Sequence, residues 1–166
     1  MDKNYYITTP IYYVNDKPHI GHAYTTILAD VLARFNRGMG KDTFFLTGLD
    51  EHGQKVQQAA QNSGMSPKEH CDVMAPRFTA LWKRLHISND DFIRTTDERH
   101  KKVVKKVLGI VMERGDIYES EYEGLYSISE ERFITEKEAD SGVYRDIKKL
   151  KEKNYFFKMS KYQDQL

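Results

Sequence analysis

The sequence predicts an α/β fold, in which a parallel, Rossmann-like sheet is followed by the start of an inserted domain. Before residue 48, a short β-branched segment, a long amphipathic segment and an apolar run follow one another, which is the order of a βαβ unit. After Gly115 the composition shifts to alternating aromatic, Ser, Glu and Gly residues, which is typical of short antiparallel strands. We therefore predict one half-domain over residues 1–115 and the start of a second, truncated segment over residues 116–166.

The composition is that of an ordinary globular chain. Of the 166 residues, 39% are hydrophobic and 31% are charged, and the net charge is only +1. A net charge this close to zero does not by itself indicate a large basic surface that binds nucleic-acid phosphates. No apolar run is long enough for a membrane span, and the N-terminus lacks the apolar core of a signal peptide. The single cysteine, Cys71, excludes an internal disulfide, and we expect a buried thiol in a cytoplasmic protein.

The βαβ unit is predicted to begin with a strand over residues 4–9 and a helix over residues 19–37. Along that helix, apolar residues recur at three- and four-residue steps: Ile20, Ala23, Ile27, Leu28, Val31, Leu32 and Phe35. Gly38 and Gly40 are expected to end the helix. Residues 43–47, TFFLT, form the kind of apolar run that is found where a sheet is covered on both faces.

Three further helices are predicted before Gly115. The first covers residues 54–61, and the second begins at Ser66 with a capping box and with proline at its first position. In the second helix, Pro76 is expected to kink or split a stripe formed by Cys71, Met74, Phe78, Leu81 and Leu85. The third begins at residues 95–98 and ends at Gly115. Its predicted buried face consists of Val103, Val104, Val107, Leu108, Val111 and Met112.

Two loops are expected to meet at one edge of the sheet. The loop after the first strand carries His19, Gly21 and His22 at the start of a helix, where unpaired backbone N–H groups and the helix dipole favour an anion. Gly21 lets a flat ligand lie close to the backbone. The loop after the second strand carries Asp50 and His52, and the carboxyl ends of parallel strands lie at the same edge. We therefore predict a phosphate or nucleotide site.

Other interpretations of these residues remain open. His19 and His22 could ligate a metal, although a catalytic zinc site needs three protein ligands and only Asp50 and His52 are near. The histidine loop could also be purely structural. Asp50 could cap the helix that follows Gly53.

The longer sequence context resembles methionyl-tRNA synthetases, within the class I aminoacyl-tRNA synthetases. His19-Ile20-Gly21-His22 matches the HIGH signature, and the context TTPIYYVNDKPHIGHAYTTILAD and FLTGLDEHGQKV extends the match. The resemblance continues through EYEGLYSISEERFITEKE to KNYFFKMSKYQ near the last residue. It implies that residues 1–115 are the first half of a class I nucleotide-binding domain and that the following segment starts the connective peptide.

The resemblance also assigns roles to individual residues. It implies that His19 and His22 contact the phosphates of ATP, that Gly21 leaves room for adenine, and that Thr8 lies near both substrates. The residues that it places around methionine are Asp50 at the α-ammonium group and Ile11 and Tyr13 beside the side chain. Ile11 and Tyr13 could equally be residues that pack the loop.

Two family features are absent or displaced in this sequence. Lys158-Met159-Ser160-Lys161-Tyr162 is similar to the KMSKS signature but stands in a connective-peptide context, so we expect Lys158 and Lys161 to be structural or solvated. Residues 138–144 lack the cysteines of a zinc knuckle, and we predict no zinc. The lysines of residues 99–106 and 148–153 could contact RNA, but lysines among apolar residues more often form a solvated helix face.

The resemblance therefore implies a ligase that activates methionine with ATP and Mg²⁺ and transfers it to tRNA. The sequence ends in the middle of a pattern, so we expect a fragment that is inactive by itself. Two alternatives remain: another HxGH nucleotidyltransferase, or a non-catalytic fragment that folds and binds a ligand. We predict no contact with a membrane.

Overall fold

The computed structural model describes residues 3–130, 132–144 and 146–165. The chain forms two compact units, Met1–Val104 and Lys105–Leu166, and each is described by itself. The domain boundary near residue 115 stays a prediction.

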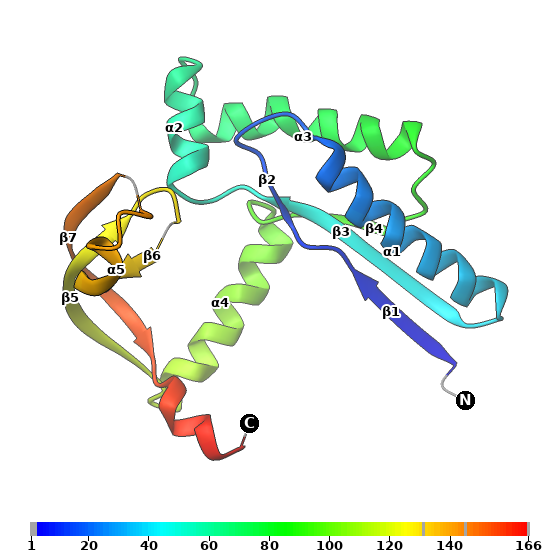
Figure 1. Cartoon of the computed structure of the whole chain (residues 1–166). Helices are drawn as coiled ribbons and strands as arrows, with labels where there is room; N and C mark the ends of the chain where they lie inside the picture. The colour runs from blue at the N-terminus through cyan, green and yellow to red at the C-terminus, as the bar shows by residue number, and fades with distance from the viewer. Residues whose placement is uncertain (1–2, 131, 145, 166) are drawn as a thin grey trace. The chain divides into compact units, whose positions relative to one another are not determined.

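The first unit is built on a parallel sheet around β3 (Asp42–Asp50) (Figure 1). β1 (Asn4–Thr8) and β2 (Tyr12–Tyr13) pair with one edge of β3, and β4 (Asp91–Arg94) pairs with the other edge. The predicted parallel βαβ unit is thereby confirmed. β2 and β4 were not predicted, because each is too short to show a periodic pattern of its own.

A bulge separates β1 from β2. Thr8 pairs with Leu46 and Tyr12 pairs with Leu49. The chain therefore advances four residues from Thr8 to Tyr12 while β3 advances three, so one extra residue is accommodated between β1 and β2. Pro10 lies in this interval, and a proline has no N–H to donate to a ladder. The chain then returns to the sheet and pairs Tyr13 with Asp50, which brings the two predicted loops together.

Four helices are interleaved with these strands along the chain: one follows β2, two follow β3 and one follows β4. They are α1 (Ile20–Gly38), α2 (Gln54–Asn62), α3 (Pro67–Arg84) and α4 (Glu98–Glu113), and α4 crosses the division between the units. The capping box is confirmed, because the Ser66 hydroxyl accepts from the Glu69 N–H and the Glu69 carboxylate accepts from the Ser66 N–H. Of the two effects expected of Pro76, the split is wrong, because α3 continues through the proline and has buried residues on both sides of it. The kink stays a prediction.

One face of the sheet carries the core of the first unit. The larger cluster joins β2 and β3 to α2 and α3, and it consists of Tyr12, Val14, Leu49, Val56, Cys71, Met74, Ala75, Phe78 and Trp82. The smaller cluster packs Ala29 and Ala33 of α1 against Phe45. Cys71 is buried as predicted, and burial, then the neighbouring Glu51 carboxylate, raise the pKa of its thiol to about 11. The thiol is therefore protonated and unreactive at neutral pH.

The other face of the sheet is open in the described residues. Tyr6 and Phe44 stack there with ring centroids 5.9 Å apart, and Phe44 is 46% exposed. The expectation of a sheet covered on both faces is therefore wrong for residues 43–47 of this chain, because buried residues alternate there with exposed or half-buried ones. Only residues 47–49 of β3 are buried in succession.

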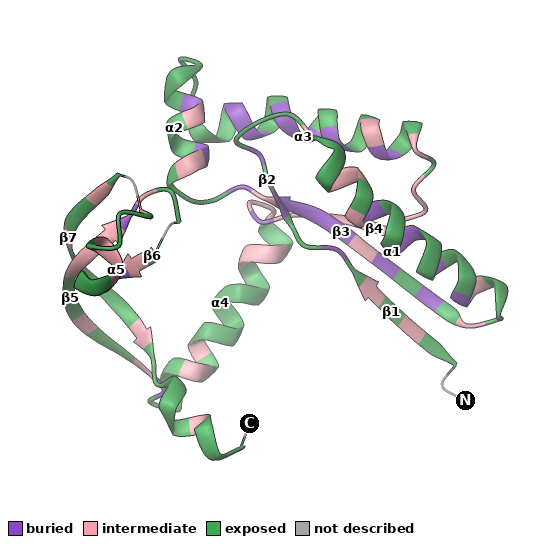
Figure 2. Cartoon of the chain, viewed as in Figure 1, coloured by how far each residue is buried: buried purple, intermediate pink, exposed green. Residues whose placement is uncertain are grey.

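The apolar stripes of two helices are also exposed (Figure 2). α1 buries Thr26, Ala29, Asp30, Ala33 and Asn36 against the sheet, whereas the predicted stripe faces outward and Ile20 reaches 87% exposure. The small side chains of Ala29 and Ala33 let α1 approach the sheet closely, and this close approach determines which face of α1 is buried. α4 has no buried residue, so its predicted buried face is wrong for this chain.

The second unit is an antiparallel sheet in the order β6-β5-β7, which confirms the antiparallel strands predicted after Gly115. Its elements are β5 (Ile117–Ser127), β6 (Arg132–Ile134), α5 (Glu136–Ala139), β7 (Ile147–Phe157) and a 3₁₀ helix (Met159–Gln165). Three lysines of β7 pair with glutamates of β5, with N–O distances of 2.7–3.2 Å: Lys149 with Glu123, Lys151 with Glu121 and Lys153 with Glu119. These lysines therefore lie on a strand and not on a helix face.

The KMSKY segment is anchored within the second unit. Lys161 and Tyr162 both bond the buried carboxylate of Asp116, at 2.5 Å each, and Lys158 donates to the Gly115 carbonyl at 2.8 Å. Lys158 and Lys161 thus make structural contacts, as predicted. Among the described residues, no helix is long and apolar enough to cross a membrane.

Candidate active site

The start of α1 is closed by its two histidines. His19 is the N-cap, and its Nδ1 accepts the Gly21 N–H at 3.1 Å, while His22 Nδ1 accepts the His19 N–H at 3.2 Å. The imidazole rings stack with centroids 3.7 Å apart. A Cβ on Gly21 would lie 2.9 Å from His19 Cε1, so only glycine lets the His19 ring fold back over the helix end.

This geometry defines which nitrogen of each ring can reach a ligand. A nitrogen that accepts a hydrogen bond carries no proton, so each neutral imidazole holds its proton on Nε2. Two N–H donors therefore lie side by side at the positive end of a helix dipole. The arrangement suits an anionic oxygen and needs no proton transfer.

A cavity of about 420 Å³ opens beside the histidines. It is lined by Ile11, Tyr12, Tyr13, Asn15, Asp16, Lys17, His19 and His22. Four of the predicted site residues, Ile11, Tyr13, His19 and His22, thus share one cavity. Thr8, Gly21 and Asp50 are not among its lining residues: Thr8 ends β1, Gly21 lies in the first turn of α1, and Asp50 ends β3.

Asp50 is the last residue of β3 and the register partner of Tyr13. Its Oδ1 accepts the backbone N–H of His52 at 3.2 Å, so the carboxylate lies at a tight turn. α2 has Gly53 at its N-cap and no side-chain cap bond, so the interpretation of Asp50 as a helix cap is wrong.

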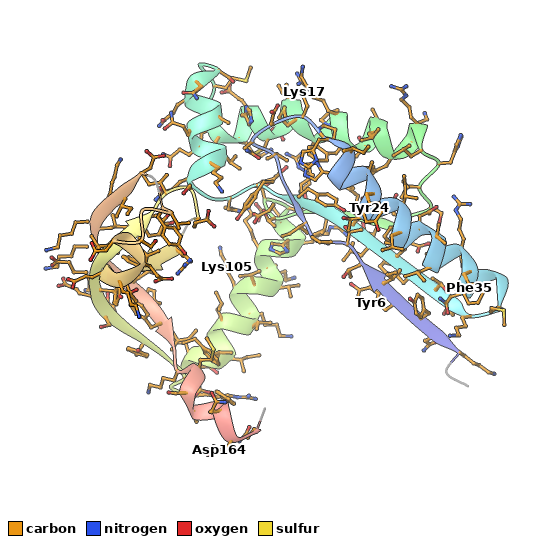
Figure 3. The ribbon with its side chains drawn as sticks, viewed as in Figure 1. Tyr6, Lys17, Tyr24, Phe35, Lys105 and Asp164 are labelled. Carbon is orange, nitrogen blue, oxygen red and sulfur yellow. The ribbon has the colours of Figure 1, made fainter. Side chains whose placement is uncertain are left out.

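Several neighbours of the site were missed from the sequence. Tyr12 and Phe78 contact the His22 ring, with centroids 4.7 and 5.5 Å away, and Tyr12 also bonds Thr26 through its hydroxyl at 2.9 Å. Lys17 adds a cation to the cavity, on the loop that leads into α1 (Figure 3). The sequence did contain signals for these neighbours. Residues 11–14 are all strand-forming types, and Lys17 lies just before the HIGH segment.

The pKa of His22 is lowered below 6.5, first by burial and then by the neighbouring His19. We expect NMR titration of the His22 ring protons to give a midpoint below 6.5, and His19→Gln to leave it there, because burial is the larger cause. The unfolded chain binds this proton more readily, so the free energy of unfolding should fall as the pH drops below 6.5. A midpoint at or above 6.5 in the wild-type chain would contradict this geometry.

Among the described residues, no group of three or more His, Cys, Asp or Glu side chains could hold a metal ion. The site therefore does not match the histidine-metal alternative. The absence of zinc stays a prediction.

Comparison with known proteins identifies the family. A family profile described as tRNA synthetases class I (M) matches residues 5–143. The chain belongs to this family. Methionine--tRNA ligases of Fusobacterium nucleatum and Thermotoga maritima are each 54% identical to it over 171 and 170 residues, which is 100% and 98% of this chain.

Solved structures agree with the family assignment. The Mycobacterium tuberculosis methionyl-tRNA synthetase in complex with methionyl-adenylate superposes with a TM-score of 0.92 at 40% identity, over 98% of this chain and 34% of that chain. A complex of the Agrobacterium radiobacter LeuRS matches with a TM-score of 0.81 over 99% of this chain and 22% of its own, and at 18% identity this likeness concerns the fold alone. The class I, Rossmann-like fold is thereby confirmed. The chain spans 27% of the length of the ligases that it matches.

Proposed function

We propose that this chain carries the HIGH half of an active site that activates methionine with ATP and then transfers it to tRNA. The observation that carries the proposal is the cavity that His19 and His22 line together with Ile11 and Tyr13, with Asp50 as the register partner of Tyr13 in the sheet. The 54% identity to methionine--tRNA ligases supports methionine as the substrate over the substrates of other HxGH nucleotidyltransferases.

The proposed chemistry follows from these positions. The carboxylate of methionine attacks the α-phosphorus of ATP, methionyl-adenylate forms and pyrophosphate leaves. Such a transfer requires positioning and charge stabilisation and no covalent nucleophile. His19 and His22 would donate N–H groups to phosphate oxygens as negative charge builds, and removing one such donor typically costs about 3–4 kcal/mol of transition-state stabilisation. Lys17 would add a positive charge, and Mg²⁺ would arrive as the counter-ion of ATP.

The methionine side of the proposed site has complementary chemistry. The Asp50 carboxylate would pair with the α-ammonium group, and Ile11 and Tyr13 would provide an apolar and an aromatic wall for the thioether. We propose that Thr8, near the bulge between β1 and β2, and Gly21, at the start of α1, complete the ATP side. Transfer to tRNA, inactivity of the isolated chain and a cytoplasmic location stay predictions.

Calorimetric titration of the chain with L-methionine and with ATP tests the proposal. Losing a hydrogen bond to a charged group costs about 1.5–3 kcal/mol, so Asp50→Ala should weaken methionine binding roughly 10- to 150-fold and leave ATP binding unchanged. Asp42→Ala, at the exposed other end of β3, is the matched control and should bind like the wild type. Equal methionine binding by Asp50→Ala and the wild type would contradict the proposed role.

Pyrophosphate exchange separates the catalytic function from a fragment that only binds. If the chain binds both substrates without exchanging pyrophosphate, it is a binding half-site that needs the rest of the catalytic domain. Binding of ATP without methionine would instead favour another nucleotidyltransferase.

A further inference from the structure

The turn that follows Asp50 is held by residues that come from outside the cavity. Glu51 is the next residue, and its side chain is completely buried. Arg94, at the end of β4, donates to Glu51 through Nε at 2.6 Å and to Asp72 of α3 at 2.6 Å. Thr96 donates to the second oxygen of the Glu51 carboxylate. The buried carboxylate is therefore paired on both oxygens, as a buried charge requires.

Thr95 holds the backbone on both sides of Asp50. Its N–H donates to the Leu49 carbonyl at 3.2 Å, and its buried Oγ1 accepts the Glu51 N–H at 2.9 Å. The same Oγ1 lies 2.8 Å from His52 Nδ1. One threonine thus bonds the residue before Asp50, the residue after it and the ring of the next one.

The direction of the Asp50 carboxylate depends on this turn. Its Oδ1 accepts the His52 N–H, and the His52 ring is itself tied to Thr95. If the Thr95 hydroxyl is lost, the Glu51 N–H is left without its partner in a buried place, and the backbone of the turn loses the bond that fixes it next to Asp50. The Asp50 carboxylate would then sample several directions in place of one.

We propose that Thr95 is a positioning residue, which acts through the turn at residues 50–52 to aim the Asp50 carboxylate at the ammonium group of the amino-acid substrate. This inference rests on the proposed function, because it takes Asp50 as the ammonium ligand. Arg94 and Glu51 anchor the turn to β4 and α3 and, like Asp50, are not among the lining residues of the cavity. Thr95 affects the amino acid and not the nucleotide, since the histidines are held by their own capping bonds.

Calorimetry on Thr95→Val, which keeps the shape and removes the hydroxyl, tests the inference. We expect L-methionine to bind about tenfold more weakly, ATP to bind within twofold of the wild type, and Thr95→Ser to restore methionine binding. Thr43→Val is the matched control, since it removes a buried hydroxyl at the far end of β3, where it donates to the Lys41 carbonyl and, within the described residues, is far in sequence from the turn after Asp50. The control should leave both affinities unchanged.

A double-mutant cycle separates positioning from simple destabilisation. In an Asp50→Ala background, adding Thr95→Val should weaken methionine binding by less than twofold, because the group through which Thr95 acts is gone. The inference is overturned if the two effects multiply, or if Thr95→Val weakens ATP and methionine equally.

Amide hydrogen exchange gives a readout without ligand. Thr95→Val should speed exchange at Glu51 and His52 and leave Phe45, in the middle of β3, unchanged. Unchanged exchange at Glu51 and His52 overturns the inference even if methionine binds. A wild-type chain that binds no methionine contradicts the proposed function itself, and the inference that rests on it is overturned with it.

Discussion

Phe78→Ala is expected to lower the free energy of unfolding of the first unit by about 3–5 kcal/mol, the usual loss when a buried Phe is truncated to Ala. Phe78 is completely buried at the centre of the larger cluster. Its ring contacts Tyr12, Trp82 and His22 of the candidate site, with centroids 5.5–6.4 Å away. The variant would therefore leave a cavity beneath the site and loosen the wall of the His22 ring.

Urea unfolding followed by fluorescence measures this loss. Trp82 is the single tryptophan and is buried in the same cluster, so its emission reports on the first unit. Phe44→Ala is the matched control, because Phe44 lies on the open face of the sheet and should lose less than about 1.5 kcal/mol. Equal losses in the two variants would show that the larger cluster is not the stabilising core.

Gly48→Ala is expected to cost about 3 kcal/mol or more, because it forces two paired strands apart. A Cβ at Gly48 would lie 2.1 Å from the backbone oxygen of Ile93 and 2.5 Å from its Cγ2. Ile93 is the register partner of Gly48 on β4, and a backbone atom in a sheet has no free space into which it can move. β4 carries Arg94 into the turn after Asp50, so we expect methionine binding to weaken as well.

Thermal unfolding and methionine titration of Gly48→Ala check this result. Gly38→Ala, at the end of α1, is the control: a Cβ there meets no atom within 4 Å. It should change the free energy of unfolding by about 1 kcal/mol or less and leave binding intact. A Gly48→Ala chain with wild-type stability would contradict the close pairing of β3 with β4.

Much of the fold and part of the site could be read from local patterns. The order of strand, helix and strand, the capping box at Ser66 and the end of α4 just before Gly115 are all encoded within a few residues, and the structure has each of them. The placement of His19 and His22 at the first turn of α1 and of Asp50 at the end of β3 follows from the same short-range signals. These features depend on backbone preferences that neighbouring residues determine by themselves.

Other features depended on partners far along the chain. Periodicity identified the apolar side of α1, yet the side that packs is the one whose small residues, Ala29 and Ala33, let the helix approach Phe45. β4 is four residues with a charged residue at each end, and only its pairing with β3 makes it a strand. A strand pairing between residues so far apart in sequence cannot be recognised from the few residues around β4 alone.

The sequence by itself determined the family of this chain, the βαβ unit and the residues that carry the proposed chemistry. Only the tertiary structure decided how those residues are held, because the bonds that orient them join distant segments. Thr95 reaches Glu51 and His52 across 44 and 43 residues of sequence, and Arg94 reaches Glu51 across 43. Chemistry belongs to residue types and short motifs, whereas the direction of a side chain depends on the contacts that the complete fold supplies.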